Sequence, residues 1–212
     1  HLLKSSFVGN SIIESGDGIA VGGELWFTTG GDTAVHLLQN VTFEGNSATL
    51  GGGVYHHSSK NRPVFRHLTI INNTASTGGG VGQTTTGTGG TGEINLEATI
   101  IANNTATTGT DCQGTYHLNS TNNVITPTGC TLIGIGNISL DPDLRPVQSL
   151  PNGTWGATPN RTSPIVDVVS PLLIVFDQFW QTRDPGIDGD CSSLTTGADI
   201  GAIERQGCGP AN

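Results

Sequence analysis

The pattern of apolar and polar residues repeats along this chain. Residues 41–55 contain an apolar run, an asparagine, a glycine triplet and a second apolar stretch, and residues 68–82 repeat this order at a spacing of 27. Weaker copies begin at Phe7 and Ile101. The apolar runs are rich in Val, Ile, Thr and Phe, which favour strands, whereas Gly and Asn favour turns. A period of this size predicts short strands stacked repeat upon repeat.

Such stacking predicts which side chains meet. Equivalent residues of parallel neighbouring strands lie about 4.8 Å apart, so the apolar positions should form internal columns. One expected column is Phe7, Phe43, Ile70 and Ile101, and another is Leu38, Phe65 and Leu96. The recurring asparagines should form a hydrogen-bonded ladder at a bend or serve singly as turn residues, and they are Asn10, Asn46, Asn73 and Asn104.

The composition agrees with an all-β repeat fold. Among 212 residues there are 32 glycines, and only 5% are aromatic and 12% charged, so the chain lacks the residues that fill helices. We expect stacked repeats over residues 1–140. Beyond them, prolines in residues 141–212 exclude a long helix, and this part is predicted to be an irregular C-terminal cap on the last repeats within the same domain.

This sequence resembles two protein families. The motif Phe43-Glu-Gly-Asn46 followed by Gly51-Gly-Gly-Val-Tyr55 resembles the repeats of polymorphic outer-membrane proteins. The second half resembles the choice-of-anchor Q domain, through residues 100–112, 128–134, 141–144, 156–159, 163–167 and 198–204. The resemblance implies a right-handed parallel β-helix on a secreted or surface-attached protein. It supplies no catalytic residues.

The charge argues against two classes of partner. The formal net charge is −9, with only eight Lys and Arg residues that do not cluster, so nucleic acid and anionic membrane surfaces are not expected partners. No run of 18 apolar residues is present, and we therefore expect no transmembrane segment.

The cysteines indicate an oxidising, extracellular compartment. Of three pairings, the nearest-neighbour disulfides Cys112–Cys130 and Cys191–Cys208 are the least demanding, and a zinc site is the alternative. Seven Asn-x-Ser/Thr sequons mark candidate glycosylation sites, which are Asn40, Asn72, Asn103, Asn119, Asn137, Asn152 and Asn160.

Catalytic carboxylates do not form a column in the predicted register. Glu44 aligns with Ile71 and Ala102, so the paired acids of polysaccharide hydrolases and lyases are missing from this column. Arg66 aligns with Glu97, which predicts an ion pair between neighbouring repeats. We therefore expect no enzymatic activity.

Three smaller motifs carry candidate binding chemistry. Asp184, Asp188 and Asp190 have the oxygen-ligand density of a Ca²⁺ loop, with an acidic turn as the alternative. Trp26 and Phe27 are either core residues or an exposed platform for sugars. His56 and His57 belong to no repeated column and are expected in solvent.

Two features suggest self-association. The first predicted strand begins without an amphipathic cap, and residues 168–180 are apolar enough to need burial, under the chain's own last repeat or against another molecule. Head-to-tail stacking would then give a filament. The sequence thus predicts a non-enzymatic extracellular protein for adhesion, surface display or filament assembly; the alternative is a polysaccharide-binding or polysaccharide-degrading β-helix.

Overall fold

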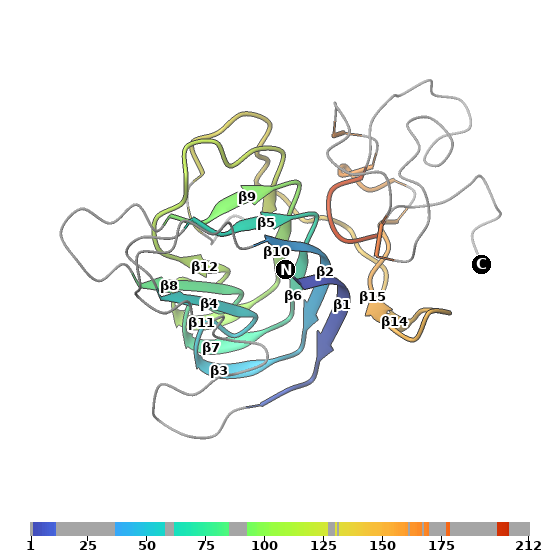
Figure 1. The fold of residues 1–212 in the computed structure, drawn as a ribbon, viewed down its shortest axis with the longest axis horizontal. Helices are drawn as coiled ribbons and strands as arrows, with labels where there is room; N and C mark the ends of the chain where they lie inside the picture. The colour runs from blue at the N-terminus through green and yellow to red at the C-terminus, as the bar shows by residue number, and fades with distance from the viewer. Residues whose placement is uncertain are drawn as a thin grey trace.

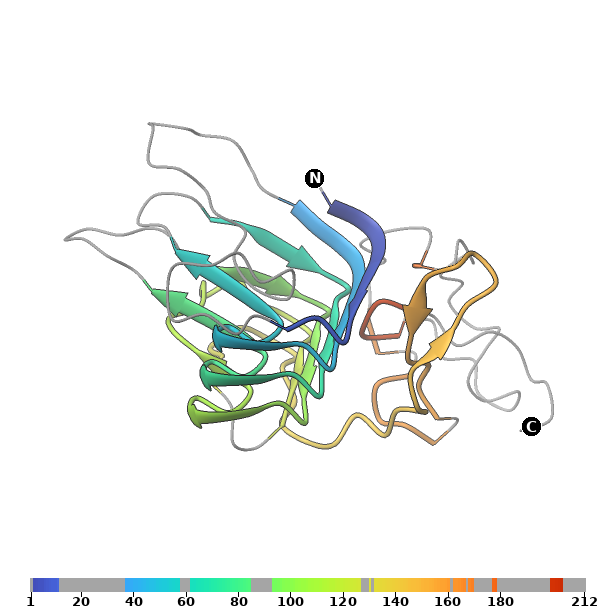
Figure 2. The ribbon, with the colours of Figure 1, turned by 90° about the horizontal axis from the view of Figure 1, so that it is seen from below.

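The computed structural model is all-β, and most of its strands are parallel (Figure 1). It describes residues 2–11, 37–57, 62–84, 93–126, 130, 132–160, 162–166, 168–169, 177–178 and 199–203. No helix occurs among these residues, and so none of them belongs to a helix long and apolar enough to cross a membrane. The parallel strands stack with the first repeat at one end and the last at the other (Figure 2).

Successive repeats contribute strands to three parallel sheets. The largest sheet has seven strands, β1 (Leu2–Val8), β2 (Leu37–Glu44), β5 (Val64–Arg66), β6 (Thr69–Ile71), β9 (Asn95–Glu97), β10 (Ile100–Ala102) and β13 (Val124–Ile125). A second sheet has β3 (Ser47–Leu50), β7 (Thr74–Thr77) and β11 (Thr105–Thr108), and a third has β4 (Val54–His57), β8 (Val81–Thr84) and β12 (Cys112–Gln113). All these pairs are parallel, whereas β14 (Gln148–Ser149) and β15 (Trp155–Gly156) pair antiparallel.

The register confirms both predicted apolar columns. In the first column Phe7, Phe43, Ile70 and Ile101 are paired in turn, and Ile125 extends the column by one repeat. The second column pairs Leu38 with Phe65 and Phe65 with Leu96. The rings of Phe7 and Phe43 stack with centroids 5.2 Å apart. Both columns belong to one buried cluster, so stacking is what provides the core.

The corners between strands explain the recurring Gly and Asn. Gly45, Asn72 and Asn103 occupy equivalent corner positions with φ of 66°, 58° and 58°, in the left-handed region that Gly and Asn tolerate best. At the next corner the backbones approach closely: a Cβ on Gly52 would lie 2.3 Å from the carbonyl oxygen of Gly79. The glycine triplet therefore sets how tightly successive repeats stack.

The C-terminal segment packs along the outer face of the seven-stranded sheet. Ile165, Val169 and Ile200 are buried there against Ile71 and Ile100. The strands β14 and β15 lie beside β1 (Figures 1 and 2), where the backbone N–H of Trp155 donates to the Ser6 hydroxyl at 2.9 Å. The contacts of this segment therefore reach the first strand, β1.

One buried side chain fastens this segment to the sheet. The Gln178 amide donates to the backbone carbonyl oxygens of Ser5 and Trp155, each at 3.0 Å, and its oxygen accepts from the Thr42 hydroxyl at 2.7 Å. Gln178 is completely buried. The three bonds connect β1, β2 and β15, so this position orients the whole segment.

Candidate functional site

The predicted asparagine ladder is present and has a direction. The backbone N–H and the side-chain amide of Asn46 both donate to Asn73 Oδ1, at 2.9 and 3.0 Å. Asn10 donates to Asn46 in the same way, and Asn73 donates to Asn104. Every rung thus donates toward the next repeat. Because Asn46, Asn73 and Asn104 are buried, the ladder is a structural element rather than a reactive surface.

Asp111 ends this ladder, and the sequence pattern did not reveal it. Asp111 Oδ1 accepts from the backbone N–H and the side-chain amide of Asn104, at 3.0 and 2.9 Å. Its other oxygen accepts from the Thr126 hydroxyl. A carboxylate has no N–H to pass on, so the chain of donors stops at Asp111.

A second polar column follows in the last repeats. The Thr99 backbone N–H donates to Asn123 Oδ1 at 2.9 Å, and the backbone N–H and amide of Asn123 donate to Asn137 Oδ1 at 3.0 and 2.8 Å. Asn137 then donates to the carbonyl oxygens of Ser120 and Gly134. Ordered stacking therefore continues well beyond Asp111.

The predicted ion pair between Arg66 and Glu97 is present, and the two residues are paired across β5 and β9 as the alignment of the repeats predicted. Arg66 Nε is 2.6 Å from Glu97 Oε2, with the side chains 27% and 16% exposed. The second carboxylate oxygen of Glu97 accepts from the Asn95 amide at 2.8 Å. Arg66 and Glu97 join neighbouring repeats, whereas Asn95 and Glu97 belong to the same strand, β9, and this arrangement offers no paired carboxylates to a substrate. No group of three or more His, Cys, Asp or Glu able to hold a metal occurs in the described part of the chain.

The histidine prediction was wrong for His56. Its side chain is only 1% exposed, on β4 beside the equally buried Gln83 of β8. The reason is the two-residue period of a strand: His56 points to the same side as Val54, which lies in the core. Nothing is described of the side chain of His57, and Trp26 and Phe27 lie outside the described residues.

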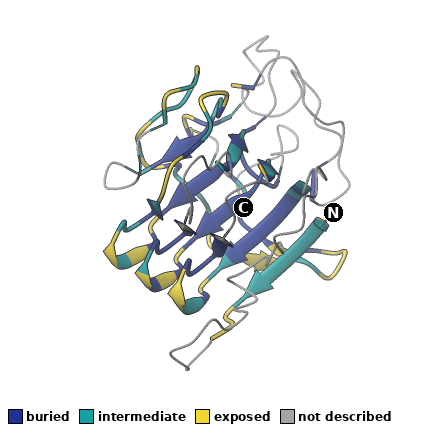
Figure 3. Ribbon diagram, turned by 60° about the vertical axis from the view of Figure 1, so that its left-hand side comes forward, coloured by how far each residue is buried: buried dark blue, intermediate teal, exposed yellow. Residues whose placement is uncertain are grey.

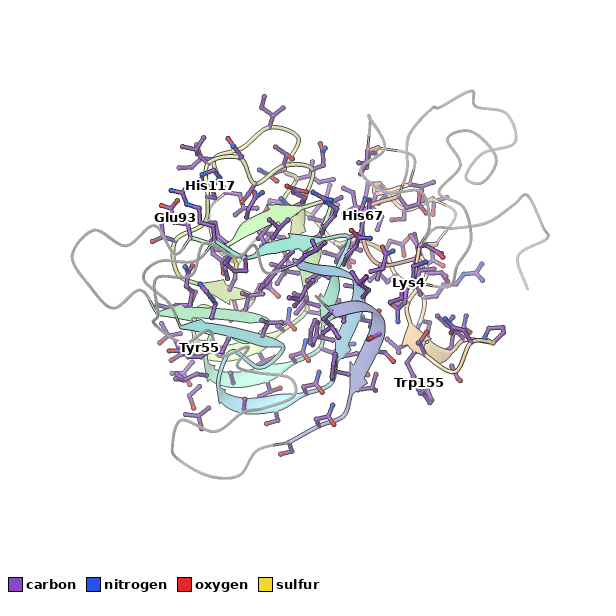
Figure 4. All side chains as sticks on the ribbon, in the orientation of Figure 1. Lys4, Tyr55, His67, Glu93, His117 and Trp155 are labelled. Carbon is purple, nitrogen blue, oxygen red and sulfur yellow. A yellow bond between two sulfur atoms is a disulfide. The ribbon has the colours of Figure 1, made fainter. Side chains whose placement is uncertain are left out.

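Burial perturbs the ionisable side chains of Lys4 and Tyr116. Burial lowers the pKa of Lys4 from its ordinary 10.5, while the negative charge of Asp177 partly opposes this shift. Lys4 and Trp155 are labelled in Figure 4 on the side of the stack that carries the C-terminal segment. Burial also raises the pKa of the Tyr116 phenol above its ordinary 10.0.

One of the two predicted disulfides is confirmed. Cys112 and Cys130 are bonded, with their Cα atoms 5.3 Å apart, and the zinc alternative does not apply to this pair. Cys191 and Cys208 lie outside the described residues. The calcium candidates Asp184, Asp188 and Asp190 also lie outside them, so that prediction stays open.

The candidate glycosylation sites differ in exposure. Asn40 is completely buried in the folded chain, which disfavours a glycan at this site. Asn137 and Asn160 are half-buried, and their amide nitrogens already donate within the protein. The exposed sites are Asn72, Asn103, Asn119 and Asn152.

The two ends of the stack differ from its middle. At the first end, Leu2 and Phe7 are half-buried, whereas their partners Leu38 and Phe43 in the next repeat are buried, and Figure 3 shows the same contrast between β1 and β2. At the last end, Leu118, Ile133 and Ile135 are 64%, 80% and 85% exposed. Of residues 168–180, the structure describes four; Val169, Asp177 and Gln178 are buried and Val168 is 44% exposed.

Comparison of the chain with protein-family models, with curated proteins and with solved structures finds no match.

Proposed function

We propose that this chain is a right-handed parallel β-helix in a secreted or cell-surface protein, where it has a structural role and assembles end to end into filaments. The observation that carries the proposal is the exposure of apolar side chains at both ends of the stack.

At the first end, β1 is the outermost strand in the described part of the chain. Among the described strands only β2 pairs with β1. The hydrogen-bonding groups of that edge and the uncovered sides of Leu2 and Phe7 form a surface on which a further strand would complete the stack. An open edge of this kind is a ready template for pairing with another chain.

At the last end, the turn 132–136 presents Ile133 and Ile135 to solvent. The turn is held firmly: the Asn122 N–H donates to the carbonyl oxygen of Ile135 at 3.0 Å, and the Asn137 amide donates to that of Gly134 at 2.8 Å. Exposed apolar groups on a fixed turn, with Leu118 on the neighbouring segment, are typical of an association surface.

The two ends are different surfaces, so a contact between them is heterologous. Such a contact repeats without closing and produces a filament rather than a dimer. The confirmed disulfide agrees with an extracellular setting, in which cystine persists.

The experiment is sedimentation velocity over a range of concentrations, with negative-stain electron microscopy of the same samples. We expect wild type to form linear assemblies and the double variant Ile133→Asn/Ile135→Asn to be monomeric. The matched control is Leu50→Asn, since Leu50 is 38% exposed on the side of the stack. Both variants alter exposed side chains, and thermal melting followed by circular dichroism checks their folding.

A wild-type chain that stays monomeric at the highest concentration overturns the assembly proposal. If the double variant still assembles, the turn 132–136 is not the surface through which copies associate. Release of reducing sugar from soluble polysaccharides would contradict the non-enzymatic role and point instead to a degradative enzyme.

A further inference from the structure

The sheet β3–β7–β11 carries a regular array of hydroxyl groups, which we call the hydroxyl face. Ser47, Thr74 and Thr105 are in register across the three strands. Two residues further along, Thr49, Ser76 and Thr107 occupy equivalent positions. Alanines stand between the two rows in all three strands, so the six outward positions hold only Ser and Thr.

These hydroxyls are available to a ligand. Five of the six residues are exposed and Ser47 is half-buried. Within the described part of the chain, none of the six side chains donates or accepts a hydrogen bond. The asparagine ladder and the Arg66–Glu97 pair, by contrast, satisfy each other inside the protein. The donors and acceptors of the hydroxyl face are thus left to water or to a partner.

The hydroxyl face is uncharged, although the chain carries a net charge of −9. The three strands read Ser-Ala-Thr-Leu, Thr-Ala-Ser-Thr and Thr-Ala-Thr-Thr. Removing water from a charge is costly, whereas hydroxyl and methyl groups lose little when a matched polar surface replaces their water. The face therefore suits broad contact with a neutral surface.

The spacing of the array is set by the backbone. Neighbouring strands lie about 4.8 Å apart, and side chains on the same face of a strand recur about every 6.7 Å. The corner columns of Gly45, Asn72 and Asn103 and of Gly51, Gly78 and Gly109 repeat the same left-handed geometry on both sides of the sheet. The three strands consequently keep the same direction and length (Figures 1 and 2).

We propose that the hydroxyl face binds the ordered water lattice of an ice crystal. Each hydroxyl has one donor and two acceptor sites and can take the place of a water molecule. The two spacings are close to the repeats of oxygen rows on prism faces of hexagonal ice. A sugar chain would instead call for aromatic platforms and convergent amide or carboxylate groups, and the three strands contain none of these. The inference is independent of filament assembly.

The test is ice growth in the presence of the purified chain, measured as crystal shaping, thermal hysteresis and inhibition of recrystallisation. The central variant is Thr74→Lys/Ser76→Lys, which places two charges on the middle strand. Its matched control is Thr115→Lys/Ser149→Lys, at two exposed positions outside this sheet. We expect faceted crystals and slowed recrystallisation with wild type and the control, and loss of both effects in the central variant.

Unaltered ice growth with wild type at millimolar concentration overturns the proposal, and so does activity that survives in the central variant. If the central variant fails to fold, Thr107→Lys on the edge strand β11 replaces it and the same loss is expected. Co-sedimentation with crystalline cellulose or chitin powder tests the alternative that the hydroxyl face binds a polysaccharide. Binding there that depends on Thr74 and Ser76, without an effect on ice, would assign the face to a polysaccharide and overturn the ice proposal.

Discussion

Replacing Asn73 by alanine tests the ladder at its centre. The Asn73 side chain takes part in four hydrogen bonds: its oxygen accepts two from Asn46, and its amide donates to the Phe43 carbonyl oxygen at 3.1 Å and to Asn104 Oδ1 at 2.9 Å. Alanine removes all four. It also leaves the backbone N–H of Asn46, a residue only 1% exposed, without its acceptor.

The expected cost follows from these bonds. A net intramolecular hydrogen bond contributes roughly 0.5–1.5 kcal/mol, and leaving a buried donor unsatisfied costs about 1–3 kcal/mol. Because the four bonds share partners, we expect Asn73→Ala to lower the free energy of unfolding by about 3–5 kcal/mol. Stability of a domain is only about 5–15 kcal/mol, so a large part of it would be lost.

The assay is equilibrium urea unfolding followed by circular dichroism. The neighbouring Asn72→Gly is the control, because Asn72 is exposed, its side chain makes only a 3.5 Å contact with Glu44, and glycine keeps its φ of 58°. Asp111→Asn should also be mild, since an amide oxygen can still accept both bonds from Asn104. A loss below about 1 kcal/mol in Asn73→Ala would refute the reasoning, because that is the net worth of a single bond.

Three further predictions use other contacts. Gln178→Ala should cost about 2–4 kcal/mol by calorimetry and expose the sheet to protease, because the three hydrogen bonds of a completely buried side chain are lost; an unchanged melting temperature would contradict this. Burial raises the pKa of Tyr116 above 10.0, so its contribution to stability is present below pH 10.0 and is lost as the pH rises beyond it, when the unfolded chain ionises first. In Tyr116→Phe the free energy of unfolding should therefore fall less steeply as the pH rises above 10.0. The same pH dependence in wild type and variant would show that ionisation of Tyr116 does not contribute. A double-mutant cycle of Arg66→Ala and Glu97→Ala should give about 0.2–1 kcal/mol, since the pair is partly exposed; a coupling well above that range would show that the pair matters more than its exposure suggests.

The sequence predicted the parts of the fold that repeat. The spacing of 27 between residues 41–55 and 68–82 placed Phe43 on Ile70 and Asn46 on Asn73, and both pairs are adjacent in the structure. The register followed because a one-residue slip would turn every apolar side chain outward. The pairing of Arg66 with Glu97 was predicted from the same alignment of repeats.

The contacts that do not repeat could not be predicted in this way. Gln178 meets Thr42 across 136 residues of sequence, and no period connects them. The column through Asn123 and Asn137 was missed because its rungs are 14 residues apart, half the earlier spacing. His56, in contrast, could have been placed correctly, because the two-residue period already put it on the same side as Val54.

The direction of the ladder bears on how copies would join. Donors run from Asn10 toward Asp111, and the carboxylate accepts without donating onward. The ladder therefore ends inside the protein and cannot continue into a second copy, so the proposed contact between copies depends on the apolar groups of the last turn and on the edge of β1. This is why Ile133 and Ile135, rather than the asparagines, are the residues to alter.

End-to-end assembly would also affect the hydroxyl face. Each copy supplies three strands of this face, and adhesion to a lattice strengthens with the number of matched groups held together. If copies join as proposed, Ile133→Asn/Ile135→Asn should weaken ice activity per chain without abolishing it, whereas Thr74→Lys/Ser76→Lys should abolish ice activity and leave assembly intact. Equal ice activity in monomeric and assembled chains would show that the faces of successive copies do not act together.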